Sequence, residues 1–246
     1  MTAFVLKIIA LICMIIDHTA YVFPMYFPEY FRVIGRLAFP LYVFLIAEGC
    51  RHTRSMKKYL FRLALFALIS EIPFDLAFNQ NFFLPIDINF INDTNIFYTL
   101  FLGVLCVYAL QIFKEKIPKF ALALSVPVTA AAMFLAYLLE TDYGAFGVAF
   151  IFLMYITPRK IPQLIVMAVC CCYEVLPFLD FAKYYGYIHP MTFPMLGALL
   201  FTVPLAAFYY GRRGPGMKWL FYIFYPAHLL IFAVILLVFV NPAFYG

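Results

Sequence analysis

The chain has 246 residues, of which 67% are hydrophobic and only 12% are charged, and its net charge is +5. Soluble domains are about 45–50% apolar and about 25% charged, and one water-soluble core could not bury so much apolar surface, so this composition excludes a soluble fold and makes lipid the solvent. In a membrane protein the placement of basic residues matters more than their sum, and the net charge therefore does not indicate a nucleic-acid partner.

Nine apolar segments follow one another along the chain, and a spanning helix needs about 20 mostly apolar residues. In chain order we expect helices over residues 4–23, 31–50, 59–78, 95–113, 118–139, 143–157, 161–179, 188–210 and 217–240. The sixth is short and contains glycine, which favours a tilted, partial or re-entrant helix. The seventh contains Glu174 and is expected to end at Pro177. Kinks are expected at the prolines inside the runs: Pro40, Pro73, Pro127, Pro194, Pro204 and Pro226.

The predicted fold is therefore all-α: a polytopic transmembrane helix bundle with about nine spanning helices, forming a single domain over residues 1–246. All but three of the 17 basic residues fall on one predicted side of the membrane, and the exceptions are Arg32, Arg36 and Lys183. The opposite loops carry acidic residues, namely Glu29, Asp87, Asp93, Glu140, Asp142 and Asp180. Because cytoplasmic loops carry the excess of Lys and Arg, the N-terminus is expected in the cytoplasm. The long outer connection 79–94 is expected to be an ordinary polar loop or a lid.

Ionisable side chains inside the apolar segments predict a buried polar site. Each costs roughly 2.5–3.5 kcal/mol on insertion scales, so it faces the protein interior and has a partner. Seven stand out: Asp17, His18, Arg36, Glu48, Glu71, Asp75 and His228. All of these except Glu48 and His228 are expected in the outer half of the first three helices, with Arg32 nearby. The plainest interpretation is an ion-pair network in which Arg36 pairs with Glu71 or Asp75.

His18 is the residue in this group that suggests chemistry. A histidine beside carboxylates in a low-dielectric pocket is a candidate general base. Adjacent helical positions point about 100° apart, so Glu71 or Asp75 could orient His18 in place of Asp17. His228 is expected either to be a core residue or to join the same site.

Other polar groups have plainer interpretations. Glu48 and His52 lie one turn apart and are expected to form a solvated pair at the inner end of the second helix. The six cysteines lie in apolar runs without metal-ligand spacing, so we expect packed thiols and no metal. Nucleotide-binding and hydrolase motifs of soluble enzymes are not found in the sequence.

Short motifs through the chain resemble the TraX family, most densely over residues 6–78. They are residues 6–11, Ile16-Asp17-His18, 35–40, Ala47-Glu48-Gly49, Lys58-Tyr59, Arg62-Leu63, 66–76, Asp142-Tyr143-Gly144 and 224–229. TraX proteins are implicated in N-terminal acetylation of conjugative pilin, and their fold is grouped with transmembrane acyltransferases. The resemblance implies that the first-helix histidine, here His18, is the catalytic base. It also implies a multi-pass protein of the bacterial cytoplasmic (inner) membrane.

The expected function is that of a membrane-bound O- or N-acyltransferase. Cytoplasmic acyl-CoA, with acetyl-CoA as the implied donor, passes its acyl group to a membrane-associated peptide, glycan or lipid at the outer side, without a metal. In this interpretation His18 and Asp17 are catalytic, and the surrounding network consists of Arg36, Glu71, Asp75 and His228. Arg36 is also a candidate to stabilise the oxyanion. The CoA phosphates are expected on a basic inner loop, made of Arg51, Arg54, Lys57, Lys58 and Arg62.

Two other classes of protein fit the same sequence features. A proton-coupled secondary transporter or lipid flippase would use the buried carboxylates as a proton relay. A non-catalytic membrane scaffold is the third interpretation, although a scaffold has no use for the buried polar cluster. Transfer from acyl-CoA without a gradient favours the enzyme, whereas gradient-dependent uptake favours the transporter.

Overall fold

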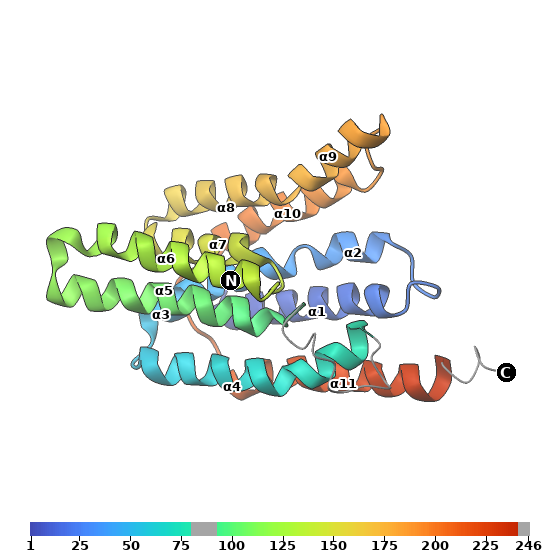
Figure 1. The fold of residues 1–246 in the computed structure, drawn as a ribbon, viewed down its shortest axis with the longest axis horizontal. Coiled ribbons are helices and arrows are strands. Elements are labelled where there is room, and N and C mark those ends of the chain that lie inside the picture. Colours follow the sequence, from blue (N-terminus) through green and yellow to red (C-terminus); the bar gives the residue numbers. More distant parts are fainter. Residues whose placement is uncertain (80–92, 241–246) are drawn as a thin grey trace. The chain divides into compact units, whose positions relative to one another are not determined.

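The computed structural model describes residues 1–79 and 93–240, and the regular structure of these residues is entirely helical (Figure 1). The helices are α1 (Ala3–Val22), α2 (Tyr30–Gly35), α3 (Ala38–His52), α4 (Met56–Phe74), α5 (Ile96–Lys116), α6 (Ala121–Leu138), α7 (Gly144–Ile156), α8 (Lys160–Glu174), α9 (Leu176–Tyr185), α10 (Thr192–Ala207) and α11 (Lys218–Ile235). Three short helical segments adjoin them: the π-helices η1 (Asp75–Asn79) and η3 (Leu236–Val240), and the 3-10 helix η2 (Pro118–Phe120). The all-α prediction is confirmed for this part of the chain. Most of the predicted outer loop, including Asp87, lies outside it.

Six helical stretches are long and apolar enough to cross a membrane, judged by length and composition. They are Ala3–Val22, Tyr30–His52, Ile96–Lys116, Pro118–Leu138, Lys160–Tyr185 and Trp219–Val238. The helices α7 and α10 are apolar but shorter, and α10 is also shorter than the predicted helix over residues 188–210. A helical membrane bundle is therefore confirmed, whereas the number of nine spans stays a prediction.

Two of the predicted helices are interrupted in the structure. The sequence predicts one helix over residues 31–50, but the structure has α2 and α3 with a break at residues 36–37. Pro40 explains this break, because its ring has no N–H for the carbonyl of Arg36 and would clash with that carbonyl. The seventh predicted helix does not end at Pro177: it bends at Val175 and continues as α9. Pro177 lies in the first turn of α9, where its missing N–H leaves no bond unmade.

The first of two compact units contains Met1–Ala47 and Ile156–Gly216. Within it α1 packs against α2, and α10 packs against both α2 and α8 (Figure 1). The amide groups of Ala3 and Phe4 donate to the carbonyls of Arg212 and Arg213, with N···O distances of 2.9 and 3.0 Å. These bonds hold the start of α1 beside the segment that follows α10. Lys7 and Arg213 consequently interact electrostatically at one end of this unit.

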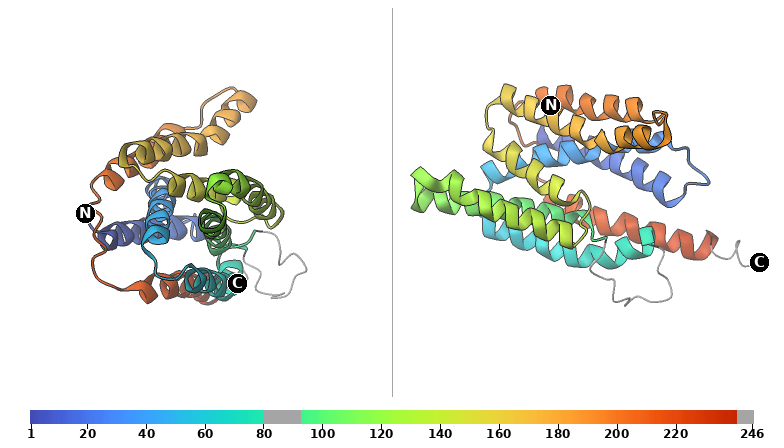
Figure 2. Two further views of the ribbon diagram at one scale, coloured as in Figure 1. Left: turned by 90° about the vertical axis from the view of Figure 1, so that its left-hand side faces the viewer. Right: turned by 45° about the horizontal axis from the view of Figure 1, so that its top comes forward.

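The second unit contains Glu48–Tyr155 and Met217–Gly246. Here α4 packs against α5 and α11, and α5 packs against α6 (Figure 2). Lys57 and Lys58 stand at the start of α4, and Lys114 and Lys116 at the end of α5. Since α4 and α5 run in opposite directions (Figure 1), these four basic residues share one end of the unit. This placement agrees with the loop charges from which the topology is predicted.

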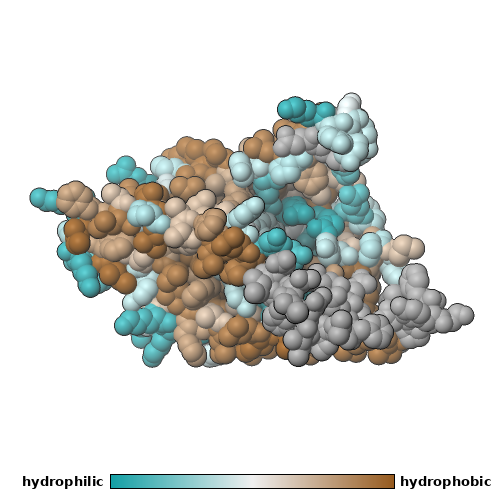
Figure 3. Space-filling model, in the orientation of Figure 1, coloured by the Kyte–Doolittle hydropathy of each residue, from teal (hydrophilic) through white to brown (hydrophobic). Residues whose placement is uncertain are grey.

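Large apolar side chains are exposed on helices of both units. Ile165 of α8 is 57% exposed in the first unit, and Phe134 of α6 is 62% exposed in the second. Hydrophobic residues cover much of the face shown in Figure 3. A soluble protein would bury such side chains, whereas lipid accepts them without cost.

The membrane orientation can be tested with single cysteines in a cysteine-free background. We expect a membrane-impermeant thiol reagent added outside sealed cells to modify a cysteine at Asp142 but not one at Lys57 or Lys116. The reason is the positive-inside rule, which places the basic end of the second unit in the cytoplasm. Labelling at Lys57 in sealed cells would overturn this topology.

Candidate functional site

Asp17 of α1 faces α2 in the first unit. Nε of Arg32 lies 3.8 Å from Oδ1 of Asp17, and the guanidinium also lies over the ring of Tyr21, 4.6 Å from its centroid. The side chains of Arg32 and Asp17 are only 24% and 21% exposed. Arg36 is also near enough for an electrostatic interaction with Asp17. The sequence predicts no partner for Arg32, so this pair is visible in the structure alone.

Gly35 allows α1 and α2 to approach closely beside Asp17. It is buried, and a Cβ built on it would overlap the side chain of Asp17. A glycine is therefore required at this contact, and it fixes the position of Asp17 from the side of α2.

The variant Gly35→Ala is expected to displace Asp17 and to lower the turnover of any reaction at this site by about 10²-fold, the effect of a misplacement of about 1 Å. Some loss of stability will accompany it, roughly 1–3 kcal/mol for an overpacked contact. Turnover of the folded protein and its melting temperature are the measurements.

Gly103→Ala is the matched control for this variant. A Cβ on Gly103 would lie 2.6 Å from Cδ1 of Ile151, and both residues belong to the second unit, whereas Asp17 belongs to the first. It should lower the melting temperature while sparing the turnover of the folded fraction. Equal loss of turnover in both variants would show that Gly35 acts only through general packing.

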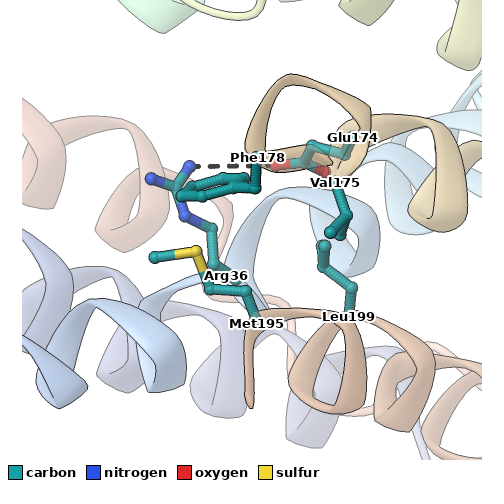
Figure 4. Close-up of a pocket in the computed structure, with 6 residues that line it drawn as sticks. All are labelled: Arg36, Glu174, Val175, Phe178, Met195 and Leu199. Atoms are coloured by element: carbon teal, nitrogen blue, oxygen red, sulfur yellow. Dashed lines mark ion pairs between the residues drawn. The ribbon is translucent and has the colours of Figure 1, made fainter. Parts of the chain in front are cut away.

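Arg36 stands at the break between α2 and α3, and it meets Glu174 at the end of α8. Its Nη1 lies 3.8 Å from Oε1 of Glu174, and the two side chains are 23% and 13% exposed. Figure 4 shows the guanidinium pointing toward the carboxylate, with the ring of Phe178 alongside. A small cavity of about 50 Å³ adjoins the pair, and its lining consists of Arg36, Glu174, Val175, Phe178, Met195 and Leu199.

Glu174 is the site residue that sequence reasoning missed. The sequence predicts Glu71 or Asp75 as the partner of Arg36, but these two residues belong to the second unit, and their pairing with Arg36 stays a prediction. A signal for Glu174 was present, because it is a carboxylate inside the apolar run 161–179 and such a group needs a cation. Glu174 is the last residue of α8, and only its partner required knowledge of the fold.

His18 follows Asp17 on α1 and is half-buried. Consecutive helical residues point about 100° apart, so the side chain of His18 leaves α1 in a direction different from that of Asp17. The first unit thus brings a histidine, the Asp17–Arg32 pair and the Arg36–Glu174 pair into one packed group of helices. The role of His18 as a base stays a prediction.

Glu71 of α4 is buried, with 2% of its surface exposed, and it is bonded to Asn95 in the second unit. Its Oε2 accepts from the side-chain amide of Asn95 and from the backbone N–H of the same residue, the latter at 3.3 Å. The side-chain amide also donates to the carbonyl of Ala67 at 2.8 Å. Asn95 in turn caps α5 by accepting from the N–H of Phe97 at 3.0 Å. Glu71 therefore fastens the start of α5 to α4, and Asp75 lies close enough to interact with it electrostatically.

The Asp142-Tyr143-Gly144 motif lies in a strained turn of the second unit. The hydroxyl of Thr99 is hydrogen-bonded to the hydroxyl of Thr141, 2.9 Å away, and to the carbonyl of Asp142. Asp142 donates its N–H to the carbonyl of Thr94 at 2.9 Å. Tyr143 has a φ of 63°, which is unfavourable for a non-glycine residue and persists only where the surroundings enforce it. These bonds pin the turn before α7 to the start of α5.

His228 of α11 is 5% exposed and lies among aromatic rings in the second unit. Its Nδ1 is 2.9 Å from the carbonyl oxygen of Phe224. The rings of Phe224, Tyr225 and Phe232 lie with centroids 5.3, 5.6 and 5.6 Å from the imidazole. This environment fits the core interpretation of His228, and its membership of a site network stays a prediction.

The pair of Glu48 and His52 is present as predicted, with 3.6 Å between Oε2 and Nε2. Glu48 also pairs with Arg51. The second guanidinium nitrogen of Arg51 donates to the carbonyls of Met154 and Tyr155 at 2.6 and 3.0 Å, which caps the C-terminal end of α7. The guanidinium of Arg51 is therefore engaged by the protein itself.

The remaining basic residues of the predicted CoA-binding loop differ in whether the protein engages their charged groups or leaves them exposed. Arg62 lies over the rings of Tyr59 and Tyr222, 5.5 and 5.7 Å from their centroids, and is half-buried. Three residues of the group are exposed: Arg54, Lys57 and Lys58. Within the predicted loop, these three are the residues available to a polyanionic ligand.

The helical structure, the exposed apolar surface and the buried ion pairs define a multi-pass membrane protein with charged groups held among its helices. The family model described as TraX protein matches residues 3–236. The chain belongs to the TraX family, as its motifs predict. It is similar to the "Probable fimbrial assembly protein FimC, serogroup H1" of Dichelobacter nodosus, which is 32% identical over 241 residues covering 94% of this chain and 93% of that protein. No solved structure matches the chain significantly.

Proposed function

We propose that this protein is a membrane-bound acyltransferase that takes an acyl group from cytoplasmic acyl-CoA and passes it to an amine or hydroxyl at the outer side of the membrane. One observation carries the proposal. The first unit holds Asp17 and Arg36 in ion pairs. Arg36 stands at the break between α2 and α3 and lines a cavity, and His18 follows Asp17 on α1. Charged groups buried among lipid-facing helices mark functional sites, and membership of the TraX family supports this choice of chemistry.

The proposed reaction needs a base and a group that stabilises negative charge. The nitrogen or oxygen atom of the acceptor attacks the thioester carbonyl, and His18 takes the proton that this atom loses. A carbon–nitrogen or carbon–oxygen bond forms, the carbon–sulfur bond breaks, and the proton passes from His18 to the departing CoA thiolate. Arg36 stabilises the oxyanion that develops on the carbonyl oxygen. Asp17 is held by Arg32 and by the contact with Gly35, one residue before His18 on α1.

A pilus subunit is the first acceptor to test. The relative from Dichelobacter nodosus is named a probable fimbrial assembly protein, and pilin modification is the role implied by the family. A place in the bacterial inner membrane follows from the same reasoning, because a donor in the cytoplasm and an acceptor outside require a protein that spans that membrane.

Purified protein in lipid nanodiscs tests this function directly. Radiolabelled acetyl-CoA is supplied with a panel of acceptors: peptides with the N-terminal sequence of a pilin, amino sugars and phosphatidylethanolamine. We expect label to pass to one acceptor class without any ion gradient. Absence of transfer, together with gradient-dependent uptake in sealed vesicles, would favour the proton-coupled transporter or flippase.

Replacing Arg54, Lys57 and Lys58 together by Gln is expected to weaken CoA binding roughly tenfold, since each exposed charge contributes about 0.2–1 kcal/mol. The difference should shrink at high salt, because salt screens exposed charges. Titration of CoA at low and high salt measures the effect. Unchanged affinity in a variant of unaltered orientation would mean that these residues serve topology alone.

A further inference from the structure

The cavity beside Arg36 combines one cation with an apolar wall. At about 10–15 Å³ for each water-sized probe, its volume of about 50 Å³ accommodates on the order of four small groups. Arg36 and Glu174 supply the charged part of the lining, with the ring of Phe178 alongside the guanidinium, and Val175, Met195 and Leu199 supply the rest of the apolar part (Figure 4). All of these residues belong to the first unit.

This lining selects a short ligand with a hydrogen-bond acceptor at one end and an apolar group at the other. A carbonyl oxygen suits Arg36, because guanidinium groups are donors only. A methyl or ethyl group suits the apolar part of the lining. Val175, Met195 and Leu199 are only 3%, 4% and 1% exposed, so the space behind these three side chains is filled by the protein.

Resting on the proposed function, we propose that this cavity is the acyl subsite, and that Met195 and Leu199 determine the length of the acyl chain. The subsite accepts two- and three-carbon acyl groups, with the carbonyl toward Arg36 and the alkyl end toward Leu199. Glu174 holds the guanidinium of Arg36 at the cavity wall. Longer chains are excluded because Met195 and Leu199 occupy the space they need.

Chain-length profiles test this assignment. The ratio kcat/KM is measured with acetyl-CoA, butyryl-CoA and hexanoyl-CoA for the native protein, Leu199→Ala and Met195→Ala. One methylene in an apolar pocket changes discrimination by about 10–200-fold. We therefore expect either variant to raise the hexanoyl-to-acetyl ratio by about tenfold or more. Leu199→Val, a smaller truncation, should shift the ratio in the same direction and replaces Leu199→Ala if that variant fails to fold.

Leu229→Ala is the matched control. Leu229 of α11 is as fully buried as Leu199, with 0% of its surface exposed, but lies in the second unit. It should lower stability without changing the hexanoyl-to-acetyl ratio. If the native protein transfers acyl groups but the Leu199 and Met195 variants keep the same hexanoyl-to-acetyl ratio, the subsite assignment is wrong and the proposed function still stands. No transfer from any acyl-CoA would overturn both.

Discussion

Replacing His18 with alanine is expected to lower the turnover of acyl transfer by about 10²–10⁴-fold, the usual contribution of a positioned general base. His18 is half-buried on α1, and the ion pairs of Asp17 and Arg36 are made with Arg32 and Glu174. The protein should therefore stay folded and bind acyl-CoA with unchanged affinity. Turnover, CoA affinity and melting temperature of the purified variant are the three measurements.

His228→Ala separates the roles of His18 and His228. Because His228 packs among Phe224, Tyr225 and Phe232, its loss should reduce stability while the folded fraction keeps its turnover. If only His228→Ala abolishes transfer, the base has been assigned to the wrong histidine. If neither variant slows transfer, the mechanism is wrong, and the proton-coupled transporter becomes the better interpretation.

Replacing Arg36 with alanine is expected to impair folding more than His18→Ala does. Arg36 is paired with Glu174, whose side chain is 13% exposed. Removal of Arg36 takes this cation away from the carboxylate of Glu174. Breaking a buried pair by removing one partner costs roughly 3–5 kcal/mol. The yield of folded protein and its melting temperature in nanodiscs report this loss. A well-folded and fully active Arg36→Ala variant would contradict both the structural and the chemical role.

The double variant Arg36→Leu with Glu174→Leu separates these two roles. Apolar residues in place of a buried ion pair are often neutral or stabilising, so folding should recover relative to Arg36→Ala. Transfer should not recover, because the group that stabilises the oxyanion is gone. If the double variant is as unstable as the single one, Glu174 is not the main partner of Arg36, and Glu71 or Asp75 becomes the better candidate.

The helices of this protein could be predicted from the sequence, but two of their breaks could not. Runs of apolar residues marked the helices, because an apolar segment lies in lipid and must form a helix there to satisfy its own backbone groups. Pro40 and Pro177 were visible as well, yet a proline can kink a helix, end it or start the next one. The bend at Val175 and the continuation into α9 depend on packing, which hydropathy does not record.

The site shows the same division more sharply. The buried ionisable residues could be recognised singly, because each one is costly in lipid wherever it points. Their partners could not, and Glu71 illustrates why: it is bonded to Asn95, a neutral residue at the boundary of a predicted helix. Arg51 was expected to bind phosphates, but its guanidinium is engaged by Glu48 and by the end of α7.

The sequence by itself determined that this protein lies in a membrane, is built of helices and belongs to the TraX family, because composition, hydropathy and local motifs are properties of the chain alone. Only the tertiary structure decided that Asp17 meets Arg32 and that Arg36 meets Glu174 beside a cavity. The physical reason is that a charge in lipid requires a partner without specifying which one. The choice among the available carboxylates is made by the helix faces that pack together, and Gly35, which brings α2 against Asp17, is one of the residues that makes it.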